Sequence, residues 1–280
     1  MTDPLVDIRD LSIHFPLGKT LFGAASVVKA VDHVSLSIPK GSFFGLVGES
    51  GSGKTTLGRS ILRAAPITSG AIQYNDGEVD YDVASIDKRQ LKDYRKRAQL
   101  IFQDPYAALS PRMTVRDIIA EPLEVMGLTK TREETDERVR AVAAKCRLNL
   151  EHLRRFPHAF SGGQRQRISI ARALVSQPKF IVADESVAAL DVSIQADILN
   201  LLKTLQRDLD LTFLFISHDL SVVAHVCDQV AVMHFGKLVE VAPSKELFAN
   251  PKDDYTKTLL NAIPSLDPDA RKRRPLPKAG

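Results

Sequence analysis

One glycine-rich segment constrains this chain more than any other part of its sequence. Residues 48–55 read GESGSGKT, which matches the pattern GxxxxGK[ST]. A short apolar run, residues 42–47, precedes the segment, and a run with helical periodicity, residues 56–64, follows it. This order of strand, loop and helix is typical of a phosphate-binding loop, in which backbone N–H groups and the positive end of a helix dipole face an anion. The sequence therefore predicts an α/β core built around a nucleotide site.

The residue types in the segment suit that role. The glycines let the backbone approach phosphate oxygens where a Cβ atom would stand in the way. Lys54 is expected to contact the β- and γ-phosphates, and the Thr55 hydroxyl to bind Mg²⁺. The predicted nucleotide-binding segment comprises Gly48, Glu49, Ser50, Gly51, Ser52, Gly53, Lys54, Thr55 and Thr56.

The apolar pattern divides the rest of the chain into three kinds of segment. Alternation of apolar and polar residues predicts antiparallel strands at residues 6–15, 28–38 and 71–74. Short apolar runs, most of them separated by helical stretches, predict a buried and largely parallel sheet from residues 42–47, 98–102, 180–183, 211–216 and 230–235. Helical periodicity predicts an insert containing residues 115–126, 132–146 and 164–175. A turn at residues 236–237, a hairpin strand at 238–241 and a short helix at 253–262 are expected near the end.

Two adjacent carboxylates end one of the predicted buried strands. Residues 180–185 read FIVADE, so Asp184 and Glu185 are delivered to the edge of the parallel sheet, where a nucleotide would lie. Asp184 is expected to hold Mg²⁺, directly or through water. Glu185 could polarise the water that attacks the γ-phosphate, a role that typically contributes about 10²- to 10⁴-fold in rate. The segment taken alone would also suit a pair of helix-capping carboxylates.

A second anion-binding helix start appears in the predicted helical insert. Residues 160–164 read FSGGQ before a helical run, which places Ser161, Gly162, Gly163 and Gln164 at a helix N-terminus. Other motif residues lie elsewhere in the chain. Gln103 comes earlier, after the strand at 98–102, whereas AALD at 188–191 and His218, after the strand at 211–216, come later. Together these motifs strongly resemble the nucleotide-binding subunit of ATP-binding cassette (ABC) transporters over residues 5–265.

The resemblance implies the ABC ATPase fold and specific roles for several residues. Such subunits are P-loop ATPases with an antiparallel β subdomain, a RecA-like parallel-sheet core and a helical insert. They pair head to tail, so that the loop at 48–56 of one subunit and the segment at 161–164 of the other enclose each ATP. Gln103 then senses Mg²⁺ and links to the membrane permease, Asp191 lies across the dimer interface, and His218 contacts the γ-phosphate. Phe15 stands where an aromatic residue usually stacks on adenine, although a core phenylalanine is an equal interpretation.

Within this family, several segments look like the ATPases of oligopeptide and dipeptide importers. They are FQDPYAALSPRMT at 102–114, RFPH at 155–158, NP at 250–251 and YT at 255–256. The resemblance implies an ATPase that energises import of peptides or of a related solute such as nickel, an opine or an oligosaccharide. A separate extracytoplasmic binding protein and two integral-membrane permeases would choose the solute. The working pair is expected to be a heteromer of this chain with a related ATPase, with a homodimer as the alternative.

The same resemblance divides the chain into three regions. Residues 1–103 and 177–242 are expected to form the nucleotide-binding core with its antiparallel subdomain. Residues 104–176 form the helical subdomain with the second glycine motif, and residues 243–280 form a C-terminal extension of the oligopeptide-importer type with a basic tail.

Charge and hydropathy argue against other classes. The net charge of +4 reflects 38 basic and 34 acidic residues, but five basic residues and no acids lie in the tail at 271–280. Bulk charge therefore does not support a nucleic-acid partner, and the tail is expected to be a solvated end rather than a lipid or RNA anchor. No apolar run approaches the roughly 20 residues of a membrane span, and the N-terminus lacks the regions of an export signal. We expect a peripheral protein on the cytoplasmic side of a bacterial inner membrane.

Two rival classes stay open. A soluble cassette ATPase acting on DNA or ribosomes would be expected to carry long coiled coils or a second cassette, and neither pattern occurs in the sequence. A regulatory module would bind ATP without releasing phosphate.

Overall fold

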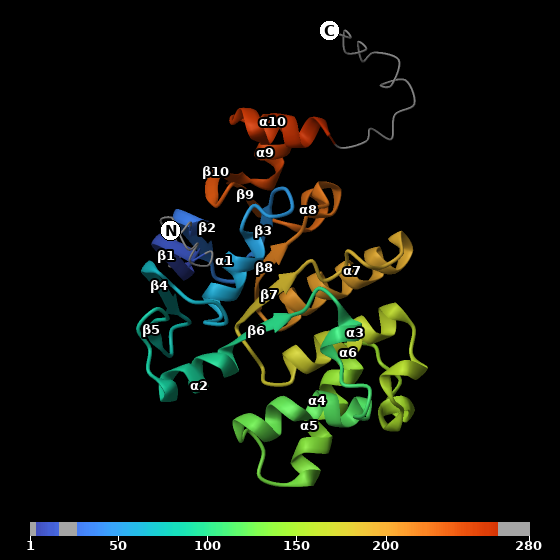
Figure 1. Ribbon diagram of the computed structural model, residues 1–280. Helices are drawn as coiled ribbons and strands as arrows, with labels where there is room; N and C mark the ends of the chain where they lie inside the picture. Colours follow the sequence, from blue (N-terminus) through green and yellow to red (C-terminus); the bar gives the residue numbers. More distant parts are fainter. Residues whose placement is uncertain (1–3, 17–26, 263–280) are drawn as a thin grey trace, which may run out of the picture.

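Two β-sheets organise the protein, and the computed structural model describes residues 4–16 and 27–262 (Figure 1). The first sheet is antiparallel, in the order β2 (Val27–Pro39), β1 (Pro4–Pro16), β4 (Ser69–Asn75) and β5 (Asp80–Asp82). The second has six strands, in the order β10 (Lys237–Pro243), β9 (Gln229–His234), β3 (Phe43–Val47), β8 (Thr212–Ile216), β7 (Phe180–Asp184) and β6 (Ala98–Ile101). These sheets confirm both the antiparallel subdomain and the parallel core predicted from the sequence.

Helices connect and cover the strands. The α-helices are α1 (Lys54–Ile61), α2 (Lys88–Arg97), α3 (Pro105–Ala108), α4 (Val115–Met126), α5 (Arg132–Lys145), α6 (Gly162–Leu174), α7 (Val192–Asp208), α8 (Leu220–Val226), α9 (Ser244–Ala249) and α10 (Asp254–Asn261). Two short 3₁₀ helices, η1 (Leu150–Arg154) and η2 (Pro157–Ala159), lie before α6. None of the helices in the described part of the chain has the length and apolar character needed to span a membrane.

The six-stranded sheet is parallel except at one edge. Strand β3 pairs in parallel with β8 and β9, and β7 pairs in parallel with β8 and β6. Only β10 runs antiparallel, as the second strand of a hairpin with β9. Every residue of β3, β7 and β8 is buried, because this sheet is covered on both faces.

Side chains alternate between two hydrophobic cores across this sheet. In β3, Phe44 and Leu46 join the core shared with α1 and the antiparallel sheet, whereas Phe43 and Val47 join the core shared with the helical region. Strand β8 repeats the pattern with its own apolar residues. Because successive side chains of a strand face opposite sides, an unbroken apolar run builds both cores at once. The carboxyl ends of β3, β7 and β8 are thereby fixed relative to one another.

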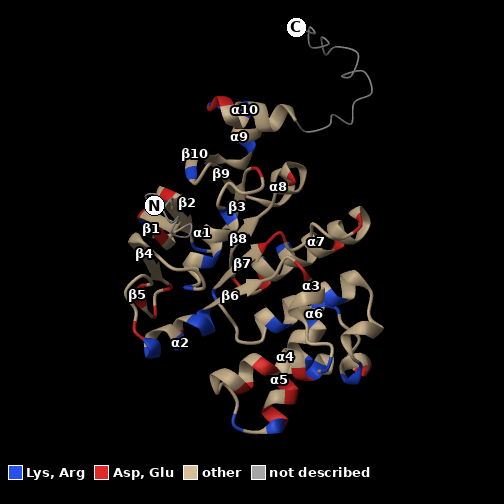
Figure 2. Cartoon of the chain, viewed as in Figure 1, with Lys and Arg blue, Asp and Glu red and all other residues tan. Residues whose placement is uncertain are grey.

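Helices α4, α5 and α6 form the predicted helical insert, at the lower end of the view in Figure 1. Thr114 and Thr131 cap the first two helices by accepting a backbone hydrogen bond. Acidic and basic residues are interspersed here, and α5 carries both (Figure 2). Helix α6 begins at Gly162, two residues before the predicted start, because Ser161 and Gln164 form a capping box around the first turn.

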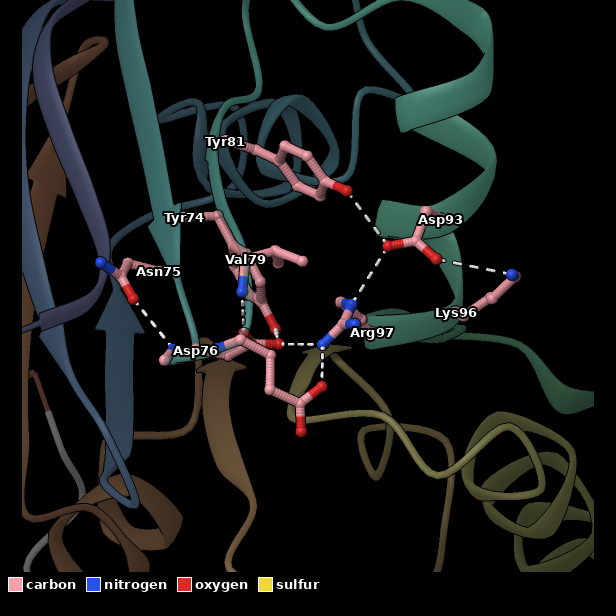
Figure 3. Close-up of polar contacts among 10 residues, drawn as sticks. Tyr74, Asn75, Asp76, Val79, Tyr81, Asp93, Lys96 and Arg97 are labelled. Atoms are coloured by element: carbon pink, nitrogen blue, oxygen red, sulfur yellow. Dashed lines mark hydrogen bonds and ion pairs between the residues drawn. The ribbon is translucent and has the colours of Figure 1, made fainter.

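A cluster of ionised side chains, which we call the Arg97 cluster, joins the antiparallel sheet to α2 (Figure 3). The guanidinium of Arg97, at the end of α2, pairs with Asp76 at 2.7 Å, Glu78 at 2.9 Å and Asp93 at 3.2 Å. The Tyr81 hydroxyl donates a hydrogen bond to Asp93 at 3.1 Å. Arg97 immediately precedes β6, so this cluster anchors the outer strand of the parallel sheet to the antiparallel one.

The C-terminal part packs on the opposite end from the helical insert. Helices α9 and α10 follow β10 and lie at the upper end of Figure 1. Tyr255, Leu259 and Leu260 of α10 pack against the larger hydrophobic core. The basic residues predicted to form a solvated tail, at 271–280, lie outside the described residues.

Candidate nucleotide site

The glycine-rich segment forms a loop between β3 and α1, and two of its glycines allow no other residue. Gly48 has a φ of +148°, and a Cβ atom there would lie 2.1 Å from the backbone oxygen of Met233. Gly53 has a φ of +105°, and its Cβ would lie 2.1 Å from the backbone oxygen of Ala30. Both distances are far inside van der Waals contact. The loop therefore depends on glycine for its close approach to β9 and β2.

Lys54 is buried beneath this loop, and its ammonium group is held by the loop itself. Its Nζ donates hydrogen bonds to the backbone oxygens of Gly48 at 2.8 Å and Glu49 at 2.7 Å, and to Ser52 Oγ at 3.2 Å. Burial lowers the pKa of Lys54, and the nearby carboxylates of Glu185 and Asp184 oppose that shift. The charge is thus fixed by neutral oxygens rather than by a carboxylate.

Two residues that could hold a metal ion, Thr55 and Asp184, meet where α1 lies against the end of β7. The hydroxyl of Thr55 donates to Asp184 Oδ1 at 2.9 Å, and the Arg59 guanidinium lies 3.7 Å from Asp184 Oδ2. Burial raises the pKa of Asp184, against the lowering effects of Thr55 and Arg59. A hydroxyl and a carboxylate side by side are hard oxygen donors, which suit Mg²⁺ shared with phosphate oxygens.

Three predicted catalytic residues meet at the carboxylate of Glu185. Gln103 Nε2 donates to Glu185 Oε2 at 2.8 Å, and His218 Nδ1 lies 3.3 Å from Glu185 Oε1. Glu185 has a φ of +45°, which is unusual for a side chain of this size, and its N–H donates to the backbone oxygen of Ile216 at 3.0 Å. The bond to β8 stabilises this backbone turn and turns Glu185 away from the line of β7.

A cleft of about 420 Å³ opens beside these groups. Eight predicted residues line it: Ser50, Gly51, Gly53, Lys54, Thr55, Thr56, Gln103 and Glu185. Five lining residues were not predicted for the site: Val28, Lys29 and Ala30 of β2, with Phe235 and Gly236 of the β9–β10 turn. No motif marks them, because they reach the cleft only through the way β2 and the hairpin pack against the loop.

The predicted adenine-stacking residue lies beside this cleft but does not line it. Phe15 pairs with Val28 across the antiparallel sheet, so the two side chains share a face, and Phe15 is 37% exposed. Phe235 is an exposed aromatic that does line the cleft, in a turn where its φ is +43°. The residues of the segment between β1 and β2, at 17–26, lie outside the described part of the chain.

The second glycine motif lies away from the cleft. Ser161 and Gln164 are exposed at the start of α6, and Gly163 is buried against α7, where a Cβ would come within 2.5 Å of Ile194 Cγ2. Asp191 lies at the start of α7, and its side chain accepts no capping hydrogen bond from the backbone of that helix. None of the residues 161–164 or Asp191 is among those that line the cleft. One copy of the described structure therefore holds a phosphate loop and a separate glycine-rich helix start.

Taken together, the fold and this geometry define a P-loop nucleotide-binding cassette. The family model described as "ABC transporter" matches residues 31–188, and that described as "Oligopeptide/dipeptide transporter, C-terminal region" matches residues 239–280. An oligopeptide transport ATP-binding protein, OppF of Bacillus subtilis, is 52% identical over 98% of this chain and 87% of its own length. A dipeptide transport ATP-binding protein, DppF of Lactococcus lactis, is 50% identical over 98% of this chain and 86% of its own length.

A solved structure agrees with these relatives. A dimeric ATP-binding cassette in a post-hydrolysis state, bound to ADP and Pi, superposes with a TM-score of 0.74 at 26% identity. The match covers 85% of this chain and 98% of the other. The chain belongs to the ABC transporter family and has the ABC ATPase fold, as its motifs predicted.

Proposed function

We propose that this protein is the ATP-hydrolysing subunit that energises an ABC importer for peptides or a related small solute. The observation that carries the proposal is the position of the Glu185 carboxylate, held between Gln103 and His218 at the cleft of the phosphate loop. A cradle that only bound a nucleotide would not need a carboxylate held between two side chains at the cleft. The relatives named as oligopeptide and dipeptide transport proteins supply the substrate class.

Each group at the cleft has a part in the proposed reaction. Lys54 and the loop N–H groups bind and orient the β- and γ-phosphates. Glu185 accepts a proton from the attacking water, while Gln103 and His218 hold its two carboxylate oxygens in place. Thr55, Asp184 and Gln103 would hold Mg²⁺, and the ion would neutralise charge on the transferred phosphoryl group.

The second glycine motif supports an ATP-dependent pair of subunits. Ser161 and Gln164 are exposed, and neither is among the described residues that line the cleft beside the phosphate loop. We propose that they complete the nucleotide site of a neighbouring subunit, with Asp191 and His218 beside the shared interface. A related but different ATPase is the favoured partner, and a second copy of this chain is the alternative.

A groove of about 450 Å³ supports contact with permease subunits. It lies between core residues such as Leu100 and residues of the helical insert such as Pro122. Its lining includes Phe102, the residue immediately before Gln103 in the sequence. Phe102 and Val125 are exposed apolar residues in its lining. A permease segment seated there would touch both regions and could transmit nucleotide-dependent movement. We propose that the protein works in this way at the cytoplasmic face of a bacterial inner membrane.

Each of the three regions of the chain would have its own function in such an importer. Residues 1–103 and 177–242 would hold the nucleotide, and residues 104–176 would present the second glycine motif. Residues 243–280 would form the extension typical of oligopeptide importers. An extracytoplasmic solute-binding protein is the indirect partner that would select the solute.

Co-purification from membranes tests the proposal most directly. We expect the tagged chain to be recovered with two polytopic subunits and a second ATPase, and to hydrolyse ATP in that complex. Glu185→Gln should leave the complex intact and remove most turnover. Recovery with ribosomes or DNA in place of polytopic subunits would refute the importer role and favour a soluble cassette ATPase.

A further inference from the structure

One tyrosine of the C-terminal extension reaches the phosphate loop. Tyr255 lies in the first turn of α10, and its hydroxyl oxygen accepts a hydrogen bond from the backbone N–H of Glu49 at 3.2 Å. Glu49 is the second residue of the loop, immediately after Gly48. The bond therefore acts where the chain leaves β3 and turns toward the phosphate-binding N–H groups.

The peptide unit between Gly48 and Glu49 is held from both sides. Its N–H donates to Tyr255, and its carbonyl oxygen, that of Gly48, accepts from the ammonium of Lys54 at 2.8 Å. A peptide unit is planar, so its N–H and C=O groups cannot turn independently. Fixing the N–H direction through Tyr255 consequently fixes the carbonyl that positions the Lys54 charge.

Tyr255 is itself held in place by β9 and β10. Its ring stacks on the imidazole of His234, with centroids 3.6 Å apart and planes 12° from parallel. At the start of α10, the Glu240 carboxylate accepts backbone hydrogen bonds from Lys252 at 2.9 Å and Asp253 at 3.0 Å. The hydroxyl is therefore presented by a rigid support rather than by a free side chain.

The turn between β9 and β10 holds the other side of the loop. The N–H of Gly236 donates to the backbone oxygen of Ser52 at 2.9 Å. The loop is thus attached at Glu49 through α10 and at Ser52 through the hairpin that precedes α10. Both attachments come from the part of the chain after β8.

We propose that Tyr255 is a positioning residue of the nucleotide site, through which the C-terminal extension holds the phosphate loop in its binding conformation. The inference rests on the proposed function, because it requires that the loop binds ATP. A loop that is already ordered does not have to be ordered when the phosphates bind, which favours affinity. The hydroxyl does not touch the reacting atoms, so its effect should fall on nucleotide binding more than on the chemical step.

Tyr255→Phe in the full chain is the central test, because it keeps the ring, the stack on His234 and the packing of α10. We expect the Kd for ATP, measured by calorimetric titration, and the KM for ATP to rise about three- to tenfold, the range that one neutral hydrogen bond supports. The value of kcat should change less than twofold. Amide exchange in a peptide that contains Glu49 should become faster in the nucleotide-free protein, because its N–H has lost its partner.

Tyr81→Phe is the matched control. It removes a tyrosine hydroxyl whose partner is Asp93, in the Arg97 cluster and not in the nucleotide cleft. We expect it to leave Kd, KM and exchange at Glu49 unchanged. His234→Phe, which keeps an aromatic partner for Tyr255, should behave more like the wild type than His234→Ala.

The outcomes separate this inference from the proposed function. A wild-type chain that binds no ATP would overturn both. A wild-type chain that binds ATP, with Tyr255→Phe equal to it in Kd, KM and exchange at Glu49, would overturn the positioning role alone. Equal losses from Tyr255→Phe and Tyr81→Phe would assign the effect to general stability and would also overturn it.

Discussion

The Arg97 cluster and the nucleotide cleft use the same kinds of charged side chain in opposite ways. In the cluster, the Arg97 guanidinium pairs directly with the carboxylates of Asp76, Glu78 and Asp93. In the cleft, the Lys54 ammonium makes its three hydrogen bonds to two backbone oxygens and a serine hydroxyl. The first cation is paired directly with anions within the fold, whereas the second is hydrogen-bonded to neutral oxygens, which agrees with its proposed role in binding phosphate.

The carboxylates show the same difference. The side chains of Asp76 and Asp184 are each 2% exposed, yet their pKa values shift in opposite directions. Burial acts to raise the pKa of Asp76, but backbone N–H groups of Val79 and Glu78 and the Arg97 guanidinium outweigh it, so the pKa is lowered. For Asp184, burial prevails and the pKa is raised. Incomplete compensation of buried charge therefore distinguishes the proposed ligand site from the structural cluster.

The largest expected effect is on turnover. Glu185→Gln removes the proposed base but keeps the shape of the side chain. We expect ATP binding to persist, hydrolysis to fall by about 10²- to 10⁴-fold, and closed dimers to accumulate in the presence of ATP. Phosphate release and size-exclusion chromatography with ATP would measure both effects.

Glu78→Gln is the control, because it alters an exposed carboxylate in the Arg97 cluster. Its turnover should equal that of the wild type. Near-normal hydrolysis in Glu185→Gln would contradict the assignment of Glu185 as base.

Removal of the buried Lys54 side chain should weaken ATP binding and not only slow hydrolysis. Lys54→Ala removes the positive charge that we propose contacts the β- and γ-phosphates when ATP binds. We expect ATP affinity to fall by about 100-fold or more, since hydrogen bonds from charged groups contribute about 1.5–3 kcal/mol each. Calorimetric titration with ATP would measure the loss. Lys96→Ala, which removes a lysine paired with Asp93, should bind ATP normally. Unchanged affinity in Lys54→Ala would count against the phosphate cradle.

Loss of a cluster carboxylate should reduce stability without changing nucleotide binding. Asp76→Asn removes one buried partner of Arg97, and we expect a decrease of about 3 kcal/mol in the free energy of unfolding at neutral pH. Urea denaturation would measure it, and Kd for ATP should be unchanged in the folded variant. A matching loss of ATP affinity would show that the two regions are energetically coupled.

The pH dependence of that variant has a defined sign. Because folding lowers the pKa of Asp76 from its ordinary value of 3.8, its carboxylate contributes stability above that pH and loses it as the pH falls through the folded value. The stability gap between wild type and Asp76→Asn should therefore narrow as the pH is lowered below about 4. A constant gap down to pH 2 would contradict this source of stability.

Local sequence predicted the elements of the core better than the walls of the cleft. The apolar runs of β3, β7 and β8 and the GESGSGKT segment each carry their own pattern, so the sheet and the loop could be recognised directly. Helix α1 begins at Lys54, two residues earlier than the helical periodicity suggested, because the left-handed conformation of Gly53 ends the loop. Apolar periodicity does not register such a boundary.

Several residues of the site are brought there by tertiary packing and could not be predicted from the sequence. Val28 and Phe235 reach the cleft through the packing of β2 and the β9–β10 turn. The YT pair at 255–256 was recognisable as part of an importer-type extension, but its contact with Glu49 depends on how α10 folds back toward β3. Residues distant in the chain leave no periodic signal for such contacts.

The last prediction separates the two aromatic residues, Phe15 and Phe235, that are candidates for stacking on adenine. Base stacking contributes about 1–3 kcal/mol where it is measured with nucleic acids, so Phe15→Ala should raise the KM for ATP about 5- to 150-fold while hydrolysis at saturation persists. Phe235→Ala is the matched comparison, because Phe235 lines the cleft whereas Phe15 lies beside Val28 at its edge. If Phe235→Ala raises KM and Phe15→Ala does not, the turn between β9 and β10 contacts adenine and Phe15 has a role in the sheet alone. If both raise KM, adenine lies between the antiparallel sheet and the hairpin. In that case Phe15 and Phe235 contribute to binding through apolar stacking, whereas Lys54 contributes through its charge.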